Sequence, residues 1–459
     1  MTSPVLPIAI ERGSAVHAEI SRLHGDGALV GHFRLEGGKR RGALGPAEGA
    51  TIQRLVDAAV GAGVPVVGVL ATSGADVGEG VASLHAWGCV ARSLSRASGV
   101  VPIILAVVGP CVSGPALLLG MADAVVMTPE TLAYVSGADA VARFTGITVS
   151  REALGGSAAH ALRSGVASLL AEDEEDALHA VAEILSYLPA NNATHPPYEA
   201  TYDEGDRASR RAAAVVPTSA MASYDVRDVV GDIVDSHSML ELHELHAPNL
   251  VTALARIDGH PVGVVANQPN QLAGTLDIEA AQKGAAFVQW CDSFGLPLVT
   301  FVDTPGFQPG KDIEWRGMIR KGAQLVHAYA EATSPRLCVV LRKAYGGAYI
   351  VMDCKTMGSD LCVAWPQAEL AVMGATGAVQ ILHGRRLLQL NPQAADEERA
   401  ALIAEYQAQY LTPAVAAERG YIDQVIDPAD TRLVLSGALG ALFDKRDHSP
   451  KRRHTNGPL

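Results

Sequence analysis

Aromatic side chains are scarce in this sequence: they make up 5% of its 459 residues, whereas 48% are hydrophobic and 46 are glycine. Such an Ala-, Gly- and Val-rich composition favours layered α/β packing over a β-sandwich. No stretch approaches the ~20 consecutive apolar residues of a membrane-spanning helix, and the N-terminus lacks the basic-then-apolar order of a signal peptide. We therefore predict a cytoplasmic α/β protein of two or three domains that is not a membrane protein.

Cysteine and positive charge are also limited. The six cysteines lie mostly in apolar runs and form no CxxC pair, which predicts reduced thiols in a protein core rather than disulfides. The net charge of -13 argues against nucleic acid as the main partner.

Several catalytic signatures are missing as well. The sequence has no GxxxxGK[ST] phosphate loop, no GxSxG elbow and no HExxH zinc motif. His243 and His246 lie three residues apart, but no further ligands cluster near them, so we predict no metal site.

What the sequence does contain is glycine directly after buried strands. The apolar run 337–341 predicts a strand that leads into Gly346-Gly347. Adjacent glycines allow a sharp turn that leaves backbone N–H groups bare and lets another molecule approach them closely. Such groups are the donors that a developing oxyanion needs, although an ordinary strand-to-helix turn is the alternative interpretation.

This order of features occurs twice in the chain. Three pairs of matching features lie 232 or 233 positions apart, namely Pro65 and Pro297, Gly74 and Gly306, and Ser113-Gly114 and Gly346-Gly347. Unrelated halves would not keep such spacing, so we predict an internal duplication. The predicted organisation is an N-terminal domain of residues 1–195, a polar linker of residues 196–225 and a C-terminal domain of residues 226–459.

The second half also contains longer distinctive stretches, among them Ala273-Gly274-Thr275-Leu276-Asp277-Ile278, Phe301 to Phe307 and Arg342 to Tyr349. Through these the chain resembles the carboxyltransferase (β) subunits of biotin-dependent acyl-CoA carboxylases, the propionyl-CoA and acetyl-CoA carboxylase family. The resemblance covers nearly the whole chain, with a divergent, shortened N-terminal half.

The resemblance implies a fold of two tandem crotonase-like (ClpP/crotonase) domains and a ring-like homo-hexamer. It places the active site where the N-terminal domain of one protomer meets the C-terminal domain of another. The implied reaction moves a carboxyl group from carboxybiotin to the α-carbon of an acyl-CoA through an enolate. Because the chain has no Ala-Met-Lys-Met biotinylation site, biotin is expected on a separate biotin carboxylase/carrier subunit.

The resemblance also assigns roles to individual residues. In the family, one oxyanion hole holds the thioester oxygen and the other holds the ureido oxygen of biotin; these correspond here to Ser113 and Gly114, and to Gly347 and Ala348. The residues implied on the substrate side are Ser73, Gly74, Ala75, Ile350, Gly374 and Ala375. Those implied on the biotin side are Pro305, Phe307, Tyr345 and Gly346.

Two departures from the family pattern lie in the first half. Asp76 replaces an arginine close to the expected CoA site, and Ser113 replaces a glycine of the first oxyanion hole. Two alternatives therefore remain open: decarboxylation of a malonyl-type thioester, and a catalytically weak subunit that completes a partner carboxyltransferase. The sequence leaves open the acyl group, the direction of the reaction and whether free CoA or a carrier protein bears the substrate.

Overall fold

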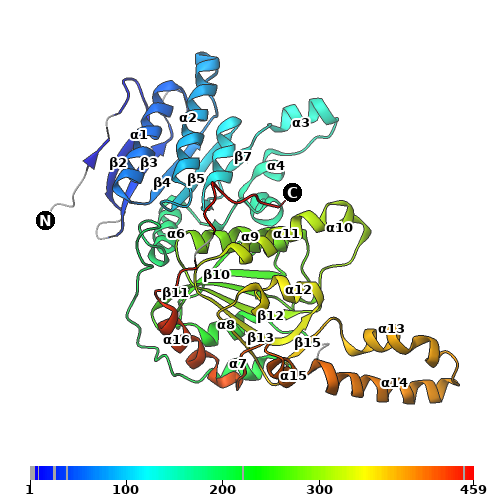
Figure 1. The fold of residues 1–459 in the computed structure, drawn as a ribbon. Helices are drawn as coiled ribbons and strands as arrows, with labels where there is room; N and C mark the ends of the chain where they lie inside the picture. Colours follow the sequence, from blue (N-terminus) through cyan, green and yellow to red (C-terminus); the bar gives the residue numbers. More distant parts are fainter. Residues whose placement is uncertain are drawn as a thin grey trace. The chain divides into compact units, whose positions relative to one another are not determined.

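The computed structural model describes residues 6–8, 10–23, 27–37, 40–219, 222–447 and 450–458. Packing divides the chain into two compact units, which we describe separately. The first unit comprises Met1–Pro197 with Leu242–His246, and the second comprises Tyr198–Glu241 with Ala247–Leu459. Each unit is built of α-helices packed around a β-sheet (Figure 1).

The sheet of the first unit has eight strands among the described residues. They are paired in the order β1-β2-β3-β4-β5-β6-β8, and β7 pairs with the end of β5. The first three strands are antiparallel, and the pairs from β3 onward are parallel. The strands are β1 (Leu6–Pro7), β2 (His17–Arg22), β3 (Leu29–Leu35), β4 (Val66–Thr72), β5 (Ile103–Val112), β6 (Ala124–Met127), β7 (Leu132–Tyr134) and β8 (Leu169–Leu170).

Helices α1 and α2 pack against each other and help to cover this sheet (Figure 1). The first begins at Pro46, where the missing N–H of proline is tolerated, and ends at Gly63, whose φ of 67° is left-handed. Strands β4 and β5 are almost entirely buried, because parallel strands in the middle of a sheet are covered on both faces. The helices are α1 (Pro46–Ala62), α2 (Val81–Ala97), α3 (Ala138–Thr145), α4 (Arg151–Gly155), α5 (Ser157–Ala159) and α6 (Glu174–Tyr187).

The sheet of the second unit repeats this arrangement. Its order is β9-β10-β11-β12-β13-β14-β16, and β15 pairs with the end of β13 as β7 does with β5. The shared order confirms the predicted internal duplication. The strands are β9 (Leu240–Leu242), β10 (Leu250–Ile257), β11 (His260–Asn267), β12 (Leu298–Thr304), β13 (Arg336–Tyr345), β14 (Leu361–Ala364), β15 (Glu369–Ala371) and β16 (Gln424–Val425).

The helices of the second unit include a hairpin, α13 and α14, that extends away from the sheet (Figure 1). Helix α7 lies within the segment predicted as the linker, and Ala212 and Tyr224 of that segment are buried in the core of the second unit. The helices are α7 (Arg210–Val215), α8 (Val226–Ile233), α9 (Ile278–Ser293), α10 (Lys311–Trp315), α11 (Met318–Glu331), α12 (Gly346–Val351), α13 (Ala375–Leu387), α14 (Pro392–Tyr406), α15 (Pro413–Glu418) and α16 (Thr431–Leu442).

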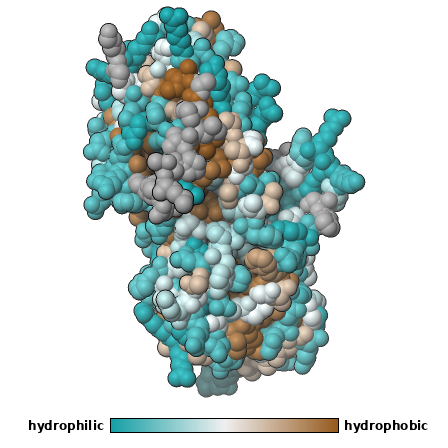
Figure 2. Space-filling model, turned by 90° about the vertical axis from the view of Figure 1, so that its left-hand side faces the viewer, coloured by the Kyte–Doolittle hydropathy of each residue, from teal (hydrophilic) through white to brown (hydrophobic). Residues whose placement is uncertain are grey.

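The surface is mixed in character. Figure 2 shows one face, on which hydrophilic side chains predominate and apolar side chains gather in separate patches. Within the part of the chain that the structure describes, no helix has the length and apolar content needed to cross a membrane.

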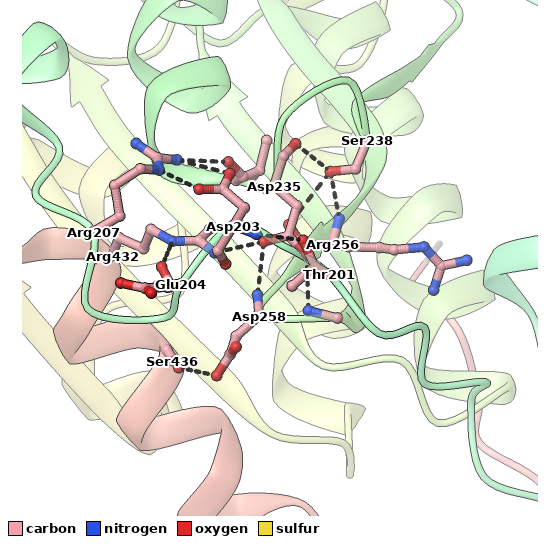
Figure 3. A network of polar contacts seen from close by, with 12 residues as sticks. Thr201, Asp203, Glu204, Arg207, Asp235, Ser238, Arg256, Asp258, Arg432 and Ser436 are labelled. Carbon is pink, nitrogen blue, oxygen red and sulfur yellow. Dashed lines mark hydrogen bonds and ion pairs between the residues drawn. The ribbon is translucent and has the colours of Figure 1, made fainter.

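A buried ion pair joins the last helix to the start of the second unit (Figure 3). The Arg432 side chain on α16 is fully buried and donates to Asp235 Oδ1 at 2.7 Å. Its other N–H groups donate to the carbonyl oxygens of Asp203, Glu204 and Ile233 at 2.6–2.9 Å. Asp235 in turn accepts the backbone N–H groups of residues 258 and 259, each at 2.8 Å. The network therefore ties three segments, residues 203–204, 233–235 and 258–259, to the guanidinium of α16.

We expect Arg432→Met to lower the free energy of unfolding of the second unit by about 3–5 kcal/mol, because Asp235 would keep its buried charge without a counter-ion. Denaturant unfolding followed by circular dichroism measures this loss. The double variant Arg432→Met with Asp235→Asn should recover part of the stability, because it removes the unpaired charge. An unfolding midpoint equal to that of the unchanged protein would contradict the prediction.

Candidate active site

Two pairs of neighbouring strands end in corresponding turns. In the first unit β4 pairs with β5, and the register shifts between Leu70 and Thr72. In the second unit β12 pairs with β13, and the register shifts between Val302 and Thr304, 232 positions later. Isolated bridges follow at the same offset, Leu44 with Ala75 and Leu276 with Phe307. The predicted site residues after these strands therefore occupy equivalent places in the two units.

The backbone after β5 is strained at Ser113. This residue has a φ of 65° and a ψ of -151°, a region that glycine occupies almost alone. The corresponding residue of the second unit is Gly346, whose φ of 60° carries no such cost. A Cβ atom on Gly74 would lie 2.9 Å from the carbonyl oxygen of Val112, so the turns after β4 and β5 are in contact.

Fewer bare N–H groups follow β5 than follow β13. The N–H of Ser113 already donates to the Tyr134 carbonyl at 2.9 Å, and Pro115 has no N–H. This leaves the N–H of Gly114 between them. In the second unit, helix α12 starts at Gly346, and the first N–H groups of a helix, which include those of Gly347 and Ala348, have no partner within it.

The two glycines in these turns have different neighbours. A Cβ atom on Gly114 would lie 2.8 Å from Nε1 of Trp87, so a larger residue would collide with the indole. A Cβ atom on Gly347 would lie 3.5 Å from Cε2 of Phe307, which is an ordinary contact. Phe307 and Gly347 are thus neighbours, and a Cβ atom at Gly347 would meet no steric clash.

A buried cluster that the sequence analysis missed fixes the ends of β12 and β13. Asp303 is fully buried and accepts the Nε of Arg342 and the hydroxyl of Tyr224, both at 2.9 Å. Arg342 also donates to the carbonyl oxygens of Ser219 and Ala222. The position of Asp303, directly before Thr304-Pro305-Gly306, was the available signal. Nothing in the sequence pointed to Tyr224, which lies in the predicted linker.

The turn after β13 is flanked by Tyr345 and by the start of helix α13 at Gly374 and Ala375. The Tyr345 hydroxyl donates to Glu369 on β15. Burial and this hydrogen bond raise the pKa of Tyr345, so the hydroxyl keeps its proton at neutral pH. A Cβ atom on Gly374 would lie 3.4 Å from the Tyr345 ring, and Ala375 begins helix α13. Burial lowers the pKa of Lys343 on the same strand, against the opposing effect of Asp303.

A pocket of about 580 Å³ opens beside this turn in the second unit. It brings together three predicted residues, Gly346, Gly347 and Ile350, with residues that were not predicted. The remaining lining comes from α12 and the segment after it, from β15 and the residue after it, and from the region of α14 and α15: Tyr349, Cys354, Lys355, Thr356, Leu370, Ala371, Val372, Tyr406, Tyr410, Val415, Ala416, Arg419 and Tyr421.

Asp76 serves the fold of the first unit. Its carboxylate caps a 3₁₀ turn by accepting the N–H of Gly78 at 2.9 Å, and it pairs with Arg40. Arg40 also lies 3.2 Å from Glu79 and remains 63% exposed. The predicted Ser73 contacts the same loop, because its hydroxyl donates to the Arg40 carbonyl at 3.1 Å. The negative charge at Asp76 is therefore matched by a cation from another loop.

A model of the carboxyl transferase domain matches residues 25–457. The chain belongs to the carboxyl transferase family. It is 43% identical to the propionyl-CoA carboxylase beta chain of Saccharopolyspora erythraea, over 98% of this chain and 86% of that protein. It is 38% identical to the methylmalonyl-CoA decarboxylase subunit alpha of Veillonella parvula, over 95% of this chain and 84% of that protein.

The fold of this carboxyl transferase is that of transcarboxylase 12S, a hexamer whose structure was solved with methylmalonyl-coenzyme A and methylmalonic acid bound. The two agree with a TM-score of 0.94 at 36% identity, over 100% of this chain and 89% of the 12S chain. Two predictions are thereby confirmed: two tandem crotonase-like domains, and a carboxyltransferase subunit of the biotin-dependent acyl-CoA carboxylase kind. Within the described residues, no group of three or more His, Cys, Asp or Glu side chains is arranged to hold a metal ion.

We expect Ser113→Gly to stabilise the carboxyl transferase by about 1 kcal/mol. Strain at such a position costs about 1–3 kcal/mol, which the substitution removes. Glycine also makes the unfolded chain more flexible, and this offsets part of the gain in stability. Thermal unfolding should show a higher melting temperature. The reverse change at the equivalent position, Gly346→Ser, is the control and should lower it. A lower melting temperature for Ser113→Gly would show that the backbone at Ser113 is not strained.

We expect Asp76→Arg, which restores the arginine of the family pattern, to lower the melting temperature. The substitution removes a cap worth about 1 kcal/mol and places a second cation beside Arg40. Asp76→Asn should cost less, because an asparagine oxygen still accepts the N–H of Gly78. Differential scanning calorimetry compares the two variants. A more stable Asp76→Arg protein would show that the carboxylate has no structural role.

Proposed function

We propose that this carboxyl transferase moves a carboxyl group from carboxybiotin to the α-carbon of an acyl thioester through an enolate. The observation that carries the proposal is the pair of equivalent strand-to-helix turns, each of which ends a buried parallel strand; the first leaves the N–H of Gly114 bare, and the second leaves those of Gly347 and Ala348 without a partner in their helix. Family membership and the acyl-CoA-related names of its relatives support the same chemistry.

In this proposal the two turns have separate roles. The N–H of Gly114 holds the thioester oxygen as negative charge develops on it. The N–H of Ser113 is already bonded to the Tyr134 carbonyl, so it is not a donor to the thioester oxygen in this proposal. The N–H groups of Gly347 and Ala348 hold the ureido oxygen of biotin. Each donor that stabilises such charge typically lowers the barrier by about 3 kcal/mol.

The residues around the second turn fit a flat polar ring at its N–H groups. Gly347 is exposed and has no Cβ atom to shield them, and Phe307 provides an apolar surface beside it. When bound, carboxybiotin on its separate carrier supplies the carboxyl group and afterwards a base for the α-proton. The chain itself positions the reactants: Asp303, Arg342 and Tyr224 hold the strand ends from which the donors project.

The assembly is also a proposal. Transcarboxylase 12S is a hexamer, and we propose a homo-hexamer for this chain, together with a biotin carboxylase/carrier subunit as its partner. We also propose that Pro305 lies near the bound biotin and that Gly374 and Ala375 lie near the bound acyl thioester. An active site formed between the N-terminal domain of one protomer and the C-terminal domain of another is part of the same proposal.

The reverse direction is the second candidate. One relative is a methylmalonyl-CoA decarboxylase subunit, and an enolate held at Gly114 is common to carboxylation and decarboxylation. The single bare N–H after β5 favours a third candidate, a weakly active subunit. Transfer of labelled carboxylate from a carboxylated biotin carrier to acyl-CoAs, with this protein purified alone, separates the three.

We expect Gly347→Val to lower turnover in that assay at least 100-fold with an unchanged melting temperature. The Cβ atom of valine makes only an ordinary contact with Phe307, and the side chain beyond it covers the N–H groups that the ligand must reach. Loss of one such donor costs about 100–1,000-fold. Gly231→Val is the matched control, because Gly231 is also helical and exposed, with no atoms near its Cβ position. Turnover in Gly347→Val within threefold of the control would overturn the assignment of this turn.

A further inference from the structure

Trp87 lies beside the one backbone donor that remains in the first turn. It stands on α2, and its half-buried side chain packs against the core of the first unit. A Cβ atom on Gly114 would lie 2.8 Å from Nε1 of the indole, 2.9 Å from Cε2 and 3.4 Å from Cδ1. The nitrogen-bearing edge of the ring therefore lies against the Cα atom of Gly114, which is bonded directly to the bare N–H.

The indole N–H of Trp87 has no hydrogen-bond partner. Within the described part of the chain no acceptor bonds Nε1, and the atom is covered from water. A buried donor without a partner is unfavourable, and most such groups in native proteins are paired. The indole nitrogen can only donate. This N–H is thus a donor that gives up no existing bond when an acceptor arrives.

The first turn is short of donors. The N–H of Ser113 is bonded to the carbonyl of Tyr134, and Pro115 has no N–H, so the backbone offers the N–H of Gly114 alone. Oxyanion holes use side-chain donors as well as backbone N–H groups. The exposed hydroxyl of Ser113 is the weaker choice, because it must exchange a bond to water for a bond to the ligand. The position and the unpaired N–H of Trp87 favour the indole.

We propose that the indole N–H of Trp87 is the second donor to the thioester oxygen in the first turn. The inference rests on the proposed function, which places that oxygen at Gly114. The indole turns about its side-chain bonds so that its N–H and the N–H of Gly114 bond the same oxygen, most strongly as negative charge develops on it. Because the site around the nitrogen is closed to water, this bond is stronger than one at an exposed position. Trp87 thereby replaces the backbone donor that Pro115 removes.

The test replaces Trp87 by phenylalanine, which keeps an aromatic ring beside Gly114 but has no N–H. Trp290→Phe is the matched control, because Nε1 of Trp290 on α9 of the second unit is also buried and, among the described residues, unpaired. Transfer of labelled carboxylate to propionyl-CoA is measured with the full-length protein and a carboxylated biotin carrier. We expect kcat of Trp87→Phe to fall about 100-fold with an unchanged KM, because the lost donor acts mainly in the transition state. Trp290→Phe should keep kcat within threefold.

A second variant separates the hydrogen bond from the shape of the ring. The tryptophan analogue benzothienylalanine, in which sulfur replaces the indole N–H, is placed at position 87. It should lower kcat as far as phenylalanine does, with an unchanged melting temperature. Full activity with the analogue, or a loss in Trp87→Phe that comes from a higher KM, would show that Trp87 acts only through packing. Either result overturns the proposal, as does a kcat of Trp87→Phe within threefold of that of Trp290→Phe.

A spectroscopic measurement separates the donor from the reaction. Ultraviolet resonance Raman spectra report the hydrogen bonding of an indole N–H, and the difference between the unchanged protein and Trp87→Phe isolates the signal of Trp87. On saturation with propionyl-CoA, this signal should shift in the direction of a stronger hydrogen bond. If the shift occurs but no carboxyl group is transferred, the donor stands and the proposed function fails. A signal that propionyl-CoA leaves unchanged overturns the donor, whether or not the protein is active.

Discussion

The conformation of the backbone at the ends of β5 and β13 is the constraint on which the candidate site depends. In both units the chain leaves a buried parallel strand through a residue with positive φ, Ser113 at 65° and Gly346 at 60°. That turn starts a helical segment directly at the strand end, where the first-turn N–H groups have no partner within the helix. The paired strands, the register shift and the covering helices all maintain this one change of direction.

The two units hold this turn by different means. In the second unit the neighbouring strand ends are joined by the buried pair of Asp303 and Arg342. At the equivalent positions of the first unit stand Ala71 and Gly109, where a Cβ atom on the glycine would lie 3.0 Å from the Ala71 methyl group. A small-residue contact thus takes the place of an ion pair. The first unit brings its strands together by close packing, and the second uses charges that also recruit Tyr224 and the carbonyl groups at residues 219 and 222.

Local signals in the sequence were sufficient for the duplication and for the turns. Glycine after an apolar run has a physical meaning wherever it occurs, and a spacing of 232 positions kept at Gly74 and Gly306 is a property of the chain alone. Interactions between residues far apart in the sequence could not be predicted from such local signals. The partnership of Asp76 with Arg40 joins two loops, and Tyr224 reaches Asp303 from a segment whose polarity predicted a linker. The π-helical turn Gln407–Leu411, which carries the pocket residue Tyr410, has no sequence signature of its own.

The divergence of the first half therefore affects the fold of the first unit less than its sequence implied. Ser113 holds a conformation that serine disfavours, because its N–H is bonded to Tyr134 on β7 and its neighbours pack against Gly74. The fold imposes the turn, and the residue tolerates it. The carboxylate of Asp76 likewise has a structural role, because it caps a 3₁₀ turn and pairs with Arg40. What the first unit has lost relative to the second is a donor, since Pro115 stands where the second unit has Ala348. The question of whether this carboxyl transferase is fully active thus becomes a question about the single N–H of Gly114 rather than about the integrity of its domain.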